Sequence, residues 1–288
     1  MLKKLTYLTL LVALCITCQA QPLSQEIKDN IQARIDNGTN AGIVVAVIDE
    51  DGPHYFSAGV KSVQSKEPVN EHAVFEIGSI SKTFTGILLA DKVIKGEMKL
   101  DDPVQNYLPE GIKAPTRNGE SIRLVQLSNH TSSLPRLPGN MNPGNPANPY
   151  ADYSEKQLYD FLNQCTLTRD IGSQYEYSNY AQGLLGNVLA KKSGVPYEQL
   201  MIDVIAKPLG LKNTRIALTP EMEKNLAKGH AGGSEVANWD IPSLAGAGAI
   251  RSTAVDMAKY VSANMGLDNS KLHPAMQLSH KNSRAEGS

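Results

Sequence analysis

Apolar residues recur at helical spacing along much of the chain. Those from Leu23 to Ile35 are four positions apart and precede Gly38, which predicts an N-terminal helix. A second apolar stripe, from Ile80 to Val93, stops at Gly96 and predicts an amphipathic helix closed by a glycine. Similar patterns predict helices over residues 154–162, 181–192, 196–205 and 253–265.

Other stretches lack the helical period. Residues 42–49 form a continuous β-branched and apolar run, residues 50–53 carry turn signals, and residues 54–60 are extended again. This pattern predicts a hairpin whose first strand is buried on both faces. Residues 137–150 are rich in Pro, Gly and Asn, which predicts a long loop. Such a loop is either a wall of a binding site or a surface excursion.

Residues 1–20 resemble a secretory signal. Lys3 and Lys4 precede an apolar run over residues 5–17, and small residues follow at the cleavage position near Ala20. The run is shorter than the ~20 apolar residues of a membrane span. We expect export with simple cleavage, and lipid attachment at Cys18 is the alternative. The expected location is therefore secreted or periplasmic, with no transmembrane segment after signal removal.

Charge and cysteine content narrow the range of partners. Removal of Lys3 and Lys4 lowers the Lys+Arg total from 28 to 26, against 29 Asp+Glu, so the mature chain is near −3. No basic run is present, and nucleic acid is therefore not expected as a partner. Cys165 is left without an intramolecular disulfide partner and is expected to be a small buried hydrophobe. His54 and His72 are isolated from other ligand types, so neither a metal nor a cofactor is expected.

Ser79 and Lys82 lie three residues apart at the start of the predicted helix over residues 80–93. Side chains at this spacing face the same way. A serine hydroxyl becomes a useful nucleophile when a neighbouring base removes its proton. The spacing alone is weak, because a serine cap followed by an exposed lysine gives the same letters. His130 could act as a base, but structural hydrogen bonding is the simpler use.

The chain carries further landmarks in a characteristic order. They are Phe75-x-Ile77-Gly78-Ser79-x-x-Lys82-Thr83-Phe84, Leu100-Asp101-Asp102-Pro103, Tyr107-Leu108-Pro109, His130-Thr131-Ser132-x-Leu134-Pro135, Tyr177-Ser178-Asn179, Leu184-Leu185-Gly186, Pro208-Leu209-Gly210 and Gly248-x-Ile250-Arg251-Ser252-Thr253. Their joint order closely resembles the serine β-lactamase and penicillin-binding-protein superfamily, in its class C and low-molecular-weight D-alanyl-D-alanine peptidase branch. The likeness extends from Gly42 to about Met265.

The resemblance implies a fold. It implies a three-layer α/β (α+β) architecture, with a mainly antiparallel sheet flanked by helices and an additional all-helical lobe. Residues 21–288 are then a single domain. Its helical lobe covers roughly residues 75–225, and its sheet lobe covers residues 21–74 and 226–288.

The resemblance also implies acyl transfer to water. By motif match Ser79 is the nucleophile, Lys82 and Tyr177 share proton transfer, and Asn179 hydrogen-bonds Lys82 and the substrate amide. Whether Lys82 or Tyr177 takes the serine proton stays open. The implied substrate is a small molecule or a peptide: a β-lactam, a D-alanyl peptide or an ester. An esterase of the same fold, a penicillin-binding module and a non-catalytic form are the alternatives.

One motif of these relatives has no clear counterpart. Relatives carry Lys or His, a small residue and Gly on a strand that lines the cleft, well after Tyr-x-Asn. Two triplets match the letters, Lys192-Ser193-Gly194 and His230-Ala231-Gly232, but both come too early in the chain. We therefore expect the sheet to be incomplete, because its C-terminal strands would begin where this sequence stops, at Ser288. We also expect little or no hydrolase activity from these 288 residues alone.

Overall fold

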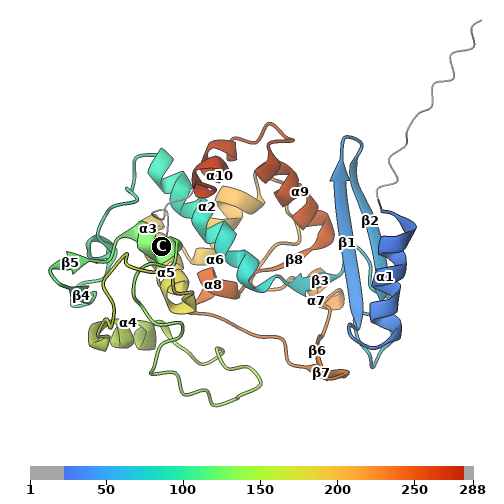
Figure 1. The fold of residues 1–288 in the computed structure, drawn as a ribbon, viewed down its shortest axis with the longest axis horizontal. Coiled ribbons are helices and arrows are strands. Elements are labelled where there is room, and N and C mark those ends of the chain that lie inside the picture. Colours follow the sequence, from blue (N-terminus) through green and yellow to red (C-terminus); the bar gives the residue numbers. More distant parts are fainter. Residues whose placement is uncertain (1–22, 282–288) are drawn as a thin grey trace, which may run out of the picture.

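The computed structural model describes residues 23–281 (Figure 1). The predicted signal over residues 1–20, with Cys18, lies outside these residues. The helices are α1 Gln25–Asp36, α2 Ser81–Ile94, α3 Leu124–Ser128, α4 Glu155–Gln164, α5 Asn179–Ser193, α6 Tyr197–Met201, α7 Pro220–Lys224, α8 Ala245–Gly248, α9 Ala254–Met265 and α10 His273–Ser279. The 3₁₀ turns are η1 Gly78–Ile80 and η2 Val104–Tyr107, and η3 Ile202–Ala206 is a π-helical turn.

Every ladder between the described strands is antiparallel. The strands are β1 Gly42–Asp49, β2 Gly52–Gly59, β3 Val74–Glu76, β4 Thr116–Arg117, β5 Glu120–Ser121, β6 Gly229–Ala231, β7 Ser234–Val236 and β8 Arg251–Thr253. They pair as β1 with β2, β3 with β8, β4 with β5, and β6 with β7. The expected combination of helices and antiparallel sheet is confirmed.

The predicted hairpin lies at one end of the molecule, between two helices. Its register pairs Gly42 with Gly59 and Asp49 with Gly52. Helix α1 packs on β2, and α9 packs against β1, so this end of the molecule has three layers (Figure 1). Leu23, Ile31 and Ala58 form a small buried cluster between α1 and the hairpin.

The prediction that the first strand is buried on both faces is wrong. Every residue of β1 is only half-buried. Within residues 23–281 this strand pairs with β2 alone, and a groove lined by Val44, Ala46 and Ile48 remains where α9 packs against it. The regular spacing in α1 also misleads at one position. Ile27 is 48% exposed, because a four-residue step overshoots one turn by about 40° and carries some side chains off the buried face.

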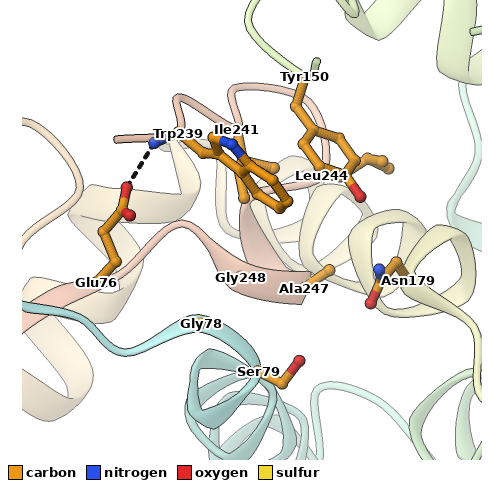
Figure 2. A pocket seen from close by; sticks show the side chains of 10 residues that line it. All are labelled: Glu76, Gly78, Ser79, Tyr150, Asn179, Trp239, Ile241, Leu244, Ala247 and Gly248. Atoms are coloured by element: carbon orange, nitrogen blue, oxygen red, sulfur yellow. Dashed lines mark hydrogen bonds between the residues drawn. The ribbon is translucent and has the colours of Figure 1, made fainter. Parts of the chain in front are cut away.

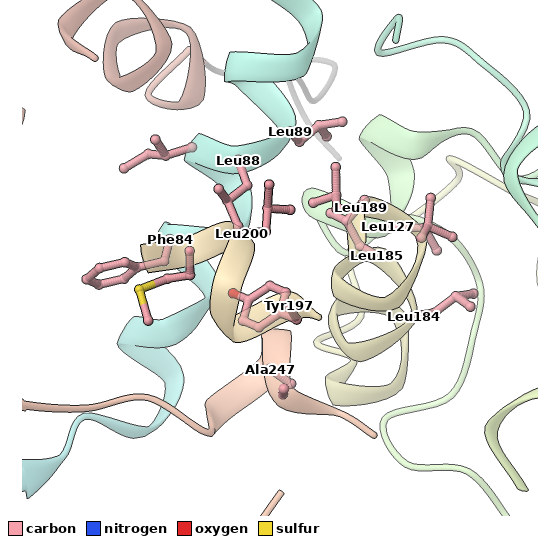
Figure 3. Packing of buried hydrophobic residues seen from close by; sticks show 14 of the residues in the cluster. Phe84, Leu88, Leu89, Leu127, Leu184, Leu185, Leu189, Tyr197, Leu200 and Ala247 are labelled. Carbon is pink, nitrogen blue, oxygen red and sulfur yellow. The ribbon is translucent and has the colours of Figure 1, made fainter. Parts of the chain in front are cut away.

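The main core lies among the helices and surrounds α2 and α5 (Figure 3). Phe84 and Leu88 on α2, and Leu184 and Leu185 on α5, are at most 1% exposed. Helix α8 approaches α5 closely because glycine stands at the contact. A Cβ on Gly183 would lie 2.4 Å from Leu244 Cδ2, so a larger residue would push the two helices apart.

The β3–β8 ladder lies beside the start of α2 and pairs the strand before α2 with the strand after α8. Phe75 pairs with Ser252, and one step further the Ile77 amide donates to the Ile250 carbonyl at 3.1 Å. The Ile250 amide in turn donates to Ser81 Oγ at 3.1 Å. The segment before α2 and the segment after α8 are therefore fixed to each other.

Candidate active site

Ser79 stands at a sharp turn between β3 and α2. Gly78 has φ +51°, in the left-handed region that favours glycine, and turns the chain from the strand into the helix. The serine follows in the short turn η1 and is exposed to solvent. Figure 2 shows its hydroxyl directed into the space between α2 and α8.

The Ser79 hydroxyl lies between a lysine and a tyrosine. Its Oγ is 2.5 Å from the Tyr177 hydroxyl, and Lys82 Nζ donates to it at 3.1 Å. Lys82 Nζ also donates to the Ala247 carbonyl at 2.6 Å, which fixes the ammonium against α8. The structure thus brings together side chains from α2 and from the segment just before α5, 98 residues apart in sequence between Ser79 and Tyr177.

The pKa values of Lys82 and Tyr177 are both lower than in the free amino acids. Burial lowers the pKa of Lys82, the Tyr177 phenol opposes that shift in part, and the positive charge of Arg136 adds to it. Burial by itself raises the pKa of Tyr177. Hydrogen bonds from Lys82 and Ser79, and the positive charges of Lys82 and Arg136, outweigh burial, so the pKa of Tyr177 lies below its ordinary value. Near neutral pH, a larger fraction of each group is therefore deprotonated than in free lysine and tyrosine.

His130 supports the tyrosine rather than the serine. Its ring stacks on the Tyr177 ring with centroids 4.6 Å apart and an interplanar angle of 28°. Its Nδ1 accepts the Ser178 amide at 3.1 Å, so this nitrogen carries no proton. Ser178 caps α5 by accepting the Ala181 amide. The predicted structural hydrogen bonding of His130 is confirmed, and the residue orients the segment that presents Tyr177.

Asn179 lines the same space at the first turn of α5. Its Oδ1 is buried and has no hydrogen-bond partner among residues 23–281. The bond from Lys82 to Asn179 that the resemblance implies is not made here, because the Lys82 ammonium is directed to Ser79 and Ala247 instead. A buried acceptor without a donor is costly, so Asn179 Oδ1 is ready for an N–H group from outside the protein.

A pocket opens beside Ser79 (Figure 2). Its wall is largely apolar, with Tyr150, Trp239, Ile241 and Leu244. Trp239 is 44% exposed, and its ring lies 5.5 Å from the Tyr150 ring, between centroids. Tyr150, the last residue of the loop over residues 137–150, thus lines the pocket, which favours the interpretation of that loop as a wall of a binding site.

The two loops that form this wall are hydrogen-bonded to each other. Asn148 Nδ2 donates to an Asp240 carboxylate oxygen at 2.9 Å, and the Asp240 amide donates back to Asn148 Oδ1 at 2.9 Å. The Trp239 indole donates to the Ala147 carbonyl at 3.1 Å. Buried Arg251 on β8 pairs with Asp240 and donates to the Trp239 carbonyl at 2.6 Å. The Trp239–Asp240 segment is thus fixed by hydrogen bonds to residues 147–148 and by Arg251.

The motifs in the sequence do not include Trp239 or Arg136. Trp239 is the single tryptophan of the chain and stands in a polar stretch, which in retrospect marks it for a surface role. Arg136 directly follows the His130–Pro135 motif, so it could have been found by extending that motif by one position.

Neither triplet considered for the third motif lines this pocket. Lys192 and Ser193 close α5, and Gly194 caps that helix with φ +69°. His230 and Ala231 belong to β6. In the described part of the chain, no three His, Cys, Asp or Glu side chains are grouped to hold a metal ion. Among the same residues, no helix has the length and apolar character needed to cross a bilayer.

Comparison with known proteins gives a consistent result. The sequence matches the Beta-lactamase family over residues 27–287. It is 35% identical over 265 residues to a Beta-lactamase of Escherichia coli strain K12, covering 89% of this chain and 67% of that protein. It is 32% identical over 257 residues to the D-alanyl-D-alanine-carboxypeptidase/endopeptidase AmpH of the same strain, covering 86% and 65%.

A solved structure shows the same likeness. The crystal structure of a Beta-lactamase/D-alanine Carboxypeptidase from Yersinia pestis, complexed with citrate, has a TM-score of 0.72 and 28% identity. The match covers 82% of this chain and 69% of that chain. The chain spans about two thirds of the length of these relatives. With a family match over most of the sequence and relatives above 30% identity, the chain belongs to the Beta-lactamase family.

Proposed function

We propose that this protein is an exported serine acyl-hydrolase that forms an acyl-enzyme on Ser79, of the β-lactamase or D-alanyl-D-alanine carboxypeptidase/endopeptidase type. One observation carries the proposal: Ser79 Oγ lies within hydrogen-bond distance of both Tyr177 and Lys82. A nucleophile in contact with a base, whose own position is fixed by further contacts, is the arrangement that covalent catalysis needs. Export rests on the signal pattern of residues 1–20.

In the proposed reaction the Tyr177–Lys82 pair accepts the Ser79 proton while Oγ attacks the substrate carbonyl. The lowered pKa of each group favours this transfer. Ser79 lies just before α2, so its backbone N–H is placed to donate to the oxygen that becomes negative. The same pair then returns a proton to the leaving group, and water releases the acyl group from Ser79.

The pocket indicates which part of the substrate lies where. The apolar wall with Tyr150 and Trp239 suits the acyl side of the substrate, because apolar groups gain free energy by leaving water. Asn179 Oδ1, a buried acceptor without a donor, suits an amide N–H next to the reacting carbonyl. This favours a β-lactam or peptide substrate with such an amide over a simple ester.

The proposal is tested with a fluorescent penicillin followed over time on the wild-type protein, Ser79→Ala and Ser234→Ala, each in a chain that spans the full length of the relatives. Ser234 is exposed on β7, away from the pocket, and controls for the loss of any serine hydroxyl. We expect labelling of wild type and Ser234→Ala, and loss of labelling by several powers of ten in Ser79→Ala. Release of label indicates a hydrolase, and a stable adduct indicates a penicillin-binding module. Normal labelling of Ser79→Ala, or none of wild type, contradicts the proposal.

A further inference from the structure

Arg136 is held beside the reacting groups by its own backbone. Its carbonyl accepts the amides of Asn179 at 2.9 Å and Tyr180 at 3.2 Å, at the start of α5. The preceding carbonyl, of Pro135, accepts the Ser178 hydroxyl at 2.6 Å. The chain at Arg136 is therefore fixed against the segment that carries Tyr177.

The Arg136 side chain extends over the Tyr177 ring. Its Cζ lies 5.0 Å from the ring centroid, and Lys82 Nζ lies 4.7 Å from the same centroid. The ion pairs within residues 23–281 include none with Arg136, whereas Arg169 pairs with Glu176 and Arg251 with Asp240. An arginine whose charge is not balanced by a carboxylate thus faces the same phenol as the lysine.

We propose that Arg136 is a positioning residue of the reaction, whose guanidinium over the Tyr177 ring favours the phenolate that accepts the Ser79 proton. The link of Arg136 to catalysis rests on the proposed function. Its effect on the charge state of Tyr177 is argued from the contact geometry alone. A guanidinium suits this place because it stays charged at all working pH values and stacks on aromatic rings. The step moves one proton from Ser79 Oγ to the Tyr177 oxygen and leaves the charge of Arg136 unchanged.

The other charged and titratable groups around Tyr177 support this assignment. Lys82 on α2 is the second cation near Tyr177. His130, which follows α3 in the chain, stacks on the Tyr177 ring. Glu176, the neighbour in sequence, is neutralised by its pair with Arg169. The positive charge of Arg136 contributes to the lowered pKa of Tyr177 and also lowers the pKa of Lys82. Removal of the guanidinium therefore raises both pKa values and lowers the fraction of each group that is deprotonated near neutral pH.

The direct test is a titration of Tyr177 itself, by NMR of protein labelled with ¹³Cζ-tyrosine and assigned with Tyr177→Phe. The variants are Arg136→Gln, Arg136→Lys and Arg34→Gln. Arg34 is exposed on α1 and controls for the same loss of net charge. At low ionic strength, on the acid side of the titration, we expect Arg136→Gln to lower the phenolate fraction about threefold. Arg136→Lys is expected to recover most of the loss, 1 M salt to reduce the difference, and Arg34→Gln to match wild type.

A Tyr177 titration in Arg136→Gln that superimposes on wild type would overturn the inference. So would equal losses in Arg136→Gln and Arg34→Gln. If Arg136→Gln leaves the titration unchanged but raises KM for substrates with a free carboxylate, Arg136 binds substrate instead, and the inference is wrong. The NMR readout needs no turnover. A wild-type protein that does not react with penicillin would therefore contradict the proposed function while still deciding whether Arg136 acts on Tyr177.

Discussion

The helical core around α2 and α5 and the hairpin end of the molecule are built differently. Phe84, Leu184 and Leu185 in the helical core are completely buried. In the hairpin, all of β1 is half-buried, and the buried cluster beside it is small. The groups around Ser79 come from the helical core: Lys82 from α2, Asn179 from α5 and the Ala247 carbonyl from α8.

This difference teaches how the site is positioned. Close-packed interiors transmit small displacements, so groups on α2, α5 and α8 keep their mutual distances only while that core is intact. The hairpin contributes no residue to the pocket beside Ser79. Changes in the hairpin are therefore expected to alter stability without altering the chemistry, and changes in the core are expected to alter both.

The largest effect, on kcat, is expected from a substitution that removes one hydroxyl group and leaves the side-chain packing unchanged. Tyr177→Phe keeps the ring against His130 and deletes the hydroxyl that contacts Ser79. In a chain that spans the full length of the relatives, we expect kcat to fall ~10²–10⁴-fold with little change in substrate binding, because general acid–base catalysis is lost. Tyr55→Phe, the same change in β2, should keep wild-type kcat. If Tyr177→Phe also does so, Lys82 alone handles the proton.

Next in size is a matched pair of core deletions. Ile87 in α2 is 1% exposed, whereas Ile43 in β1 is half-buried. Ile87→Ala is expected to lower the free energy of unfolding by ~2–5 kcal/mol, and Ile43→Ala by about 1 kcal/mol, since less apolar area is lost from a half-buried site. Urea unfolding followed by circular dichroism measures both. Equal losses would mean that the two regions are equally well packed.

A smaller effect is expected where α5 meets α8. Gly183→Ala places a methyl group 2.4 Å from Leu244 Cδ2 and 2.8 Å from Leu244 Cα. We expect a loss of ~1–3 kcal/mol in the free energy of unfolding, because the helices must separate. Gly139→Ala, whose Cβ would meet only Phe161 at 3.6 Å, should stay within about 0.5 kcal/mol of wild type. Full stability of Gly183→Ala would show that Leu244 moves aside without cost.

Local sequence signals predicted the elements that bear the site. The apolar stripe before Gly96 and the glycine before Ser79 are local features, and they gave the turn and α2. A local signal likewise predicted the helix over residues 181–192, which forms α5. The side chains of Ser79, Lys82 and Tyr177 meet as the family resemblance implied, although their catalytic roles remain proposals.

The parts that the sequence did not predict depend on contacts between distant segments. Trp239 is held in the wall of the pocket by contacts between distant segments, such as the hydrogen bonds between Asp240 and Asn148, 92 residues away. Lys82 on α2 reaches the Ala247 carbonyl because α8 packs against α2, where a Cβ on Gly246 would lie 3.0 Å from Thr85 Oγ1. The half-burial of β1 likewise depends on which strands and helices cover it. No periodicity within one segment contains this information.

The central claim is that Ser79 carries the acyl group. The most direct measurement is intact-mass spectrometry of the protein after brief exposure to penicillin, followed by peptide mapping of the trapped adduct. We expect a mass increase of one penicillin, located on Ser79 in the peptide that also contains Lys82. An adduct on any other residue, or an unchanged mass together with rapid loss of penicillin that persists in Ser79→Ala, would contradict the claim.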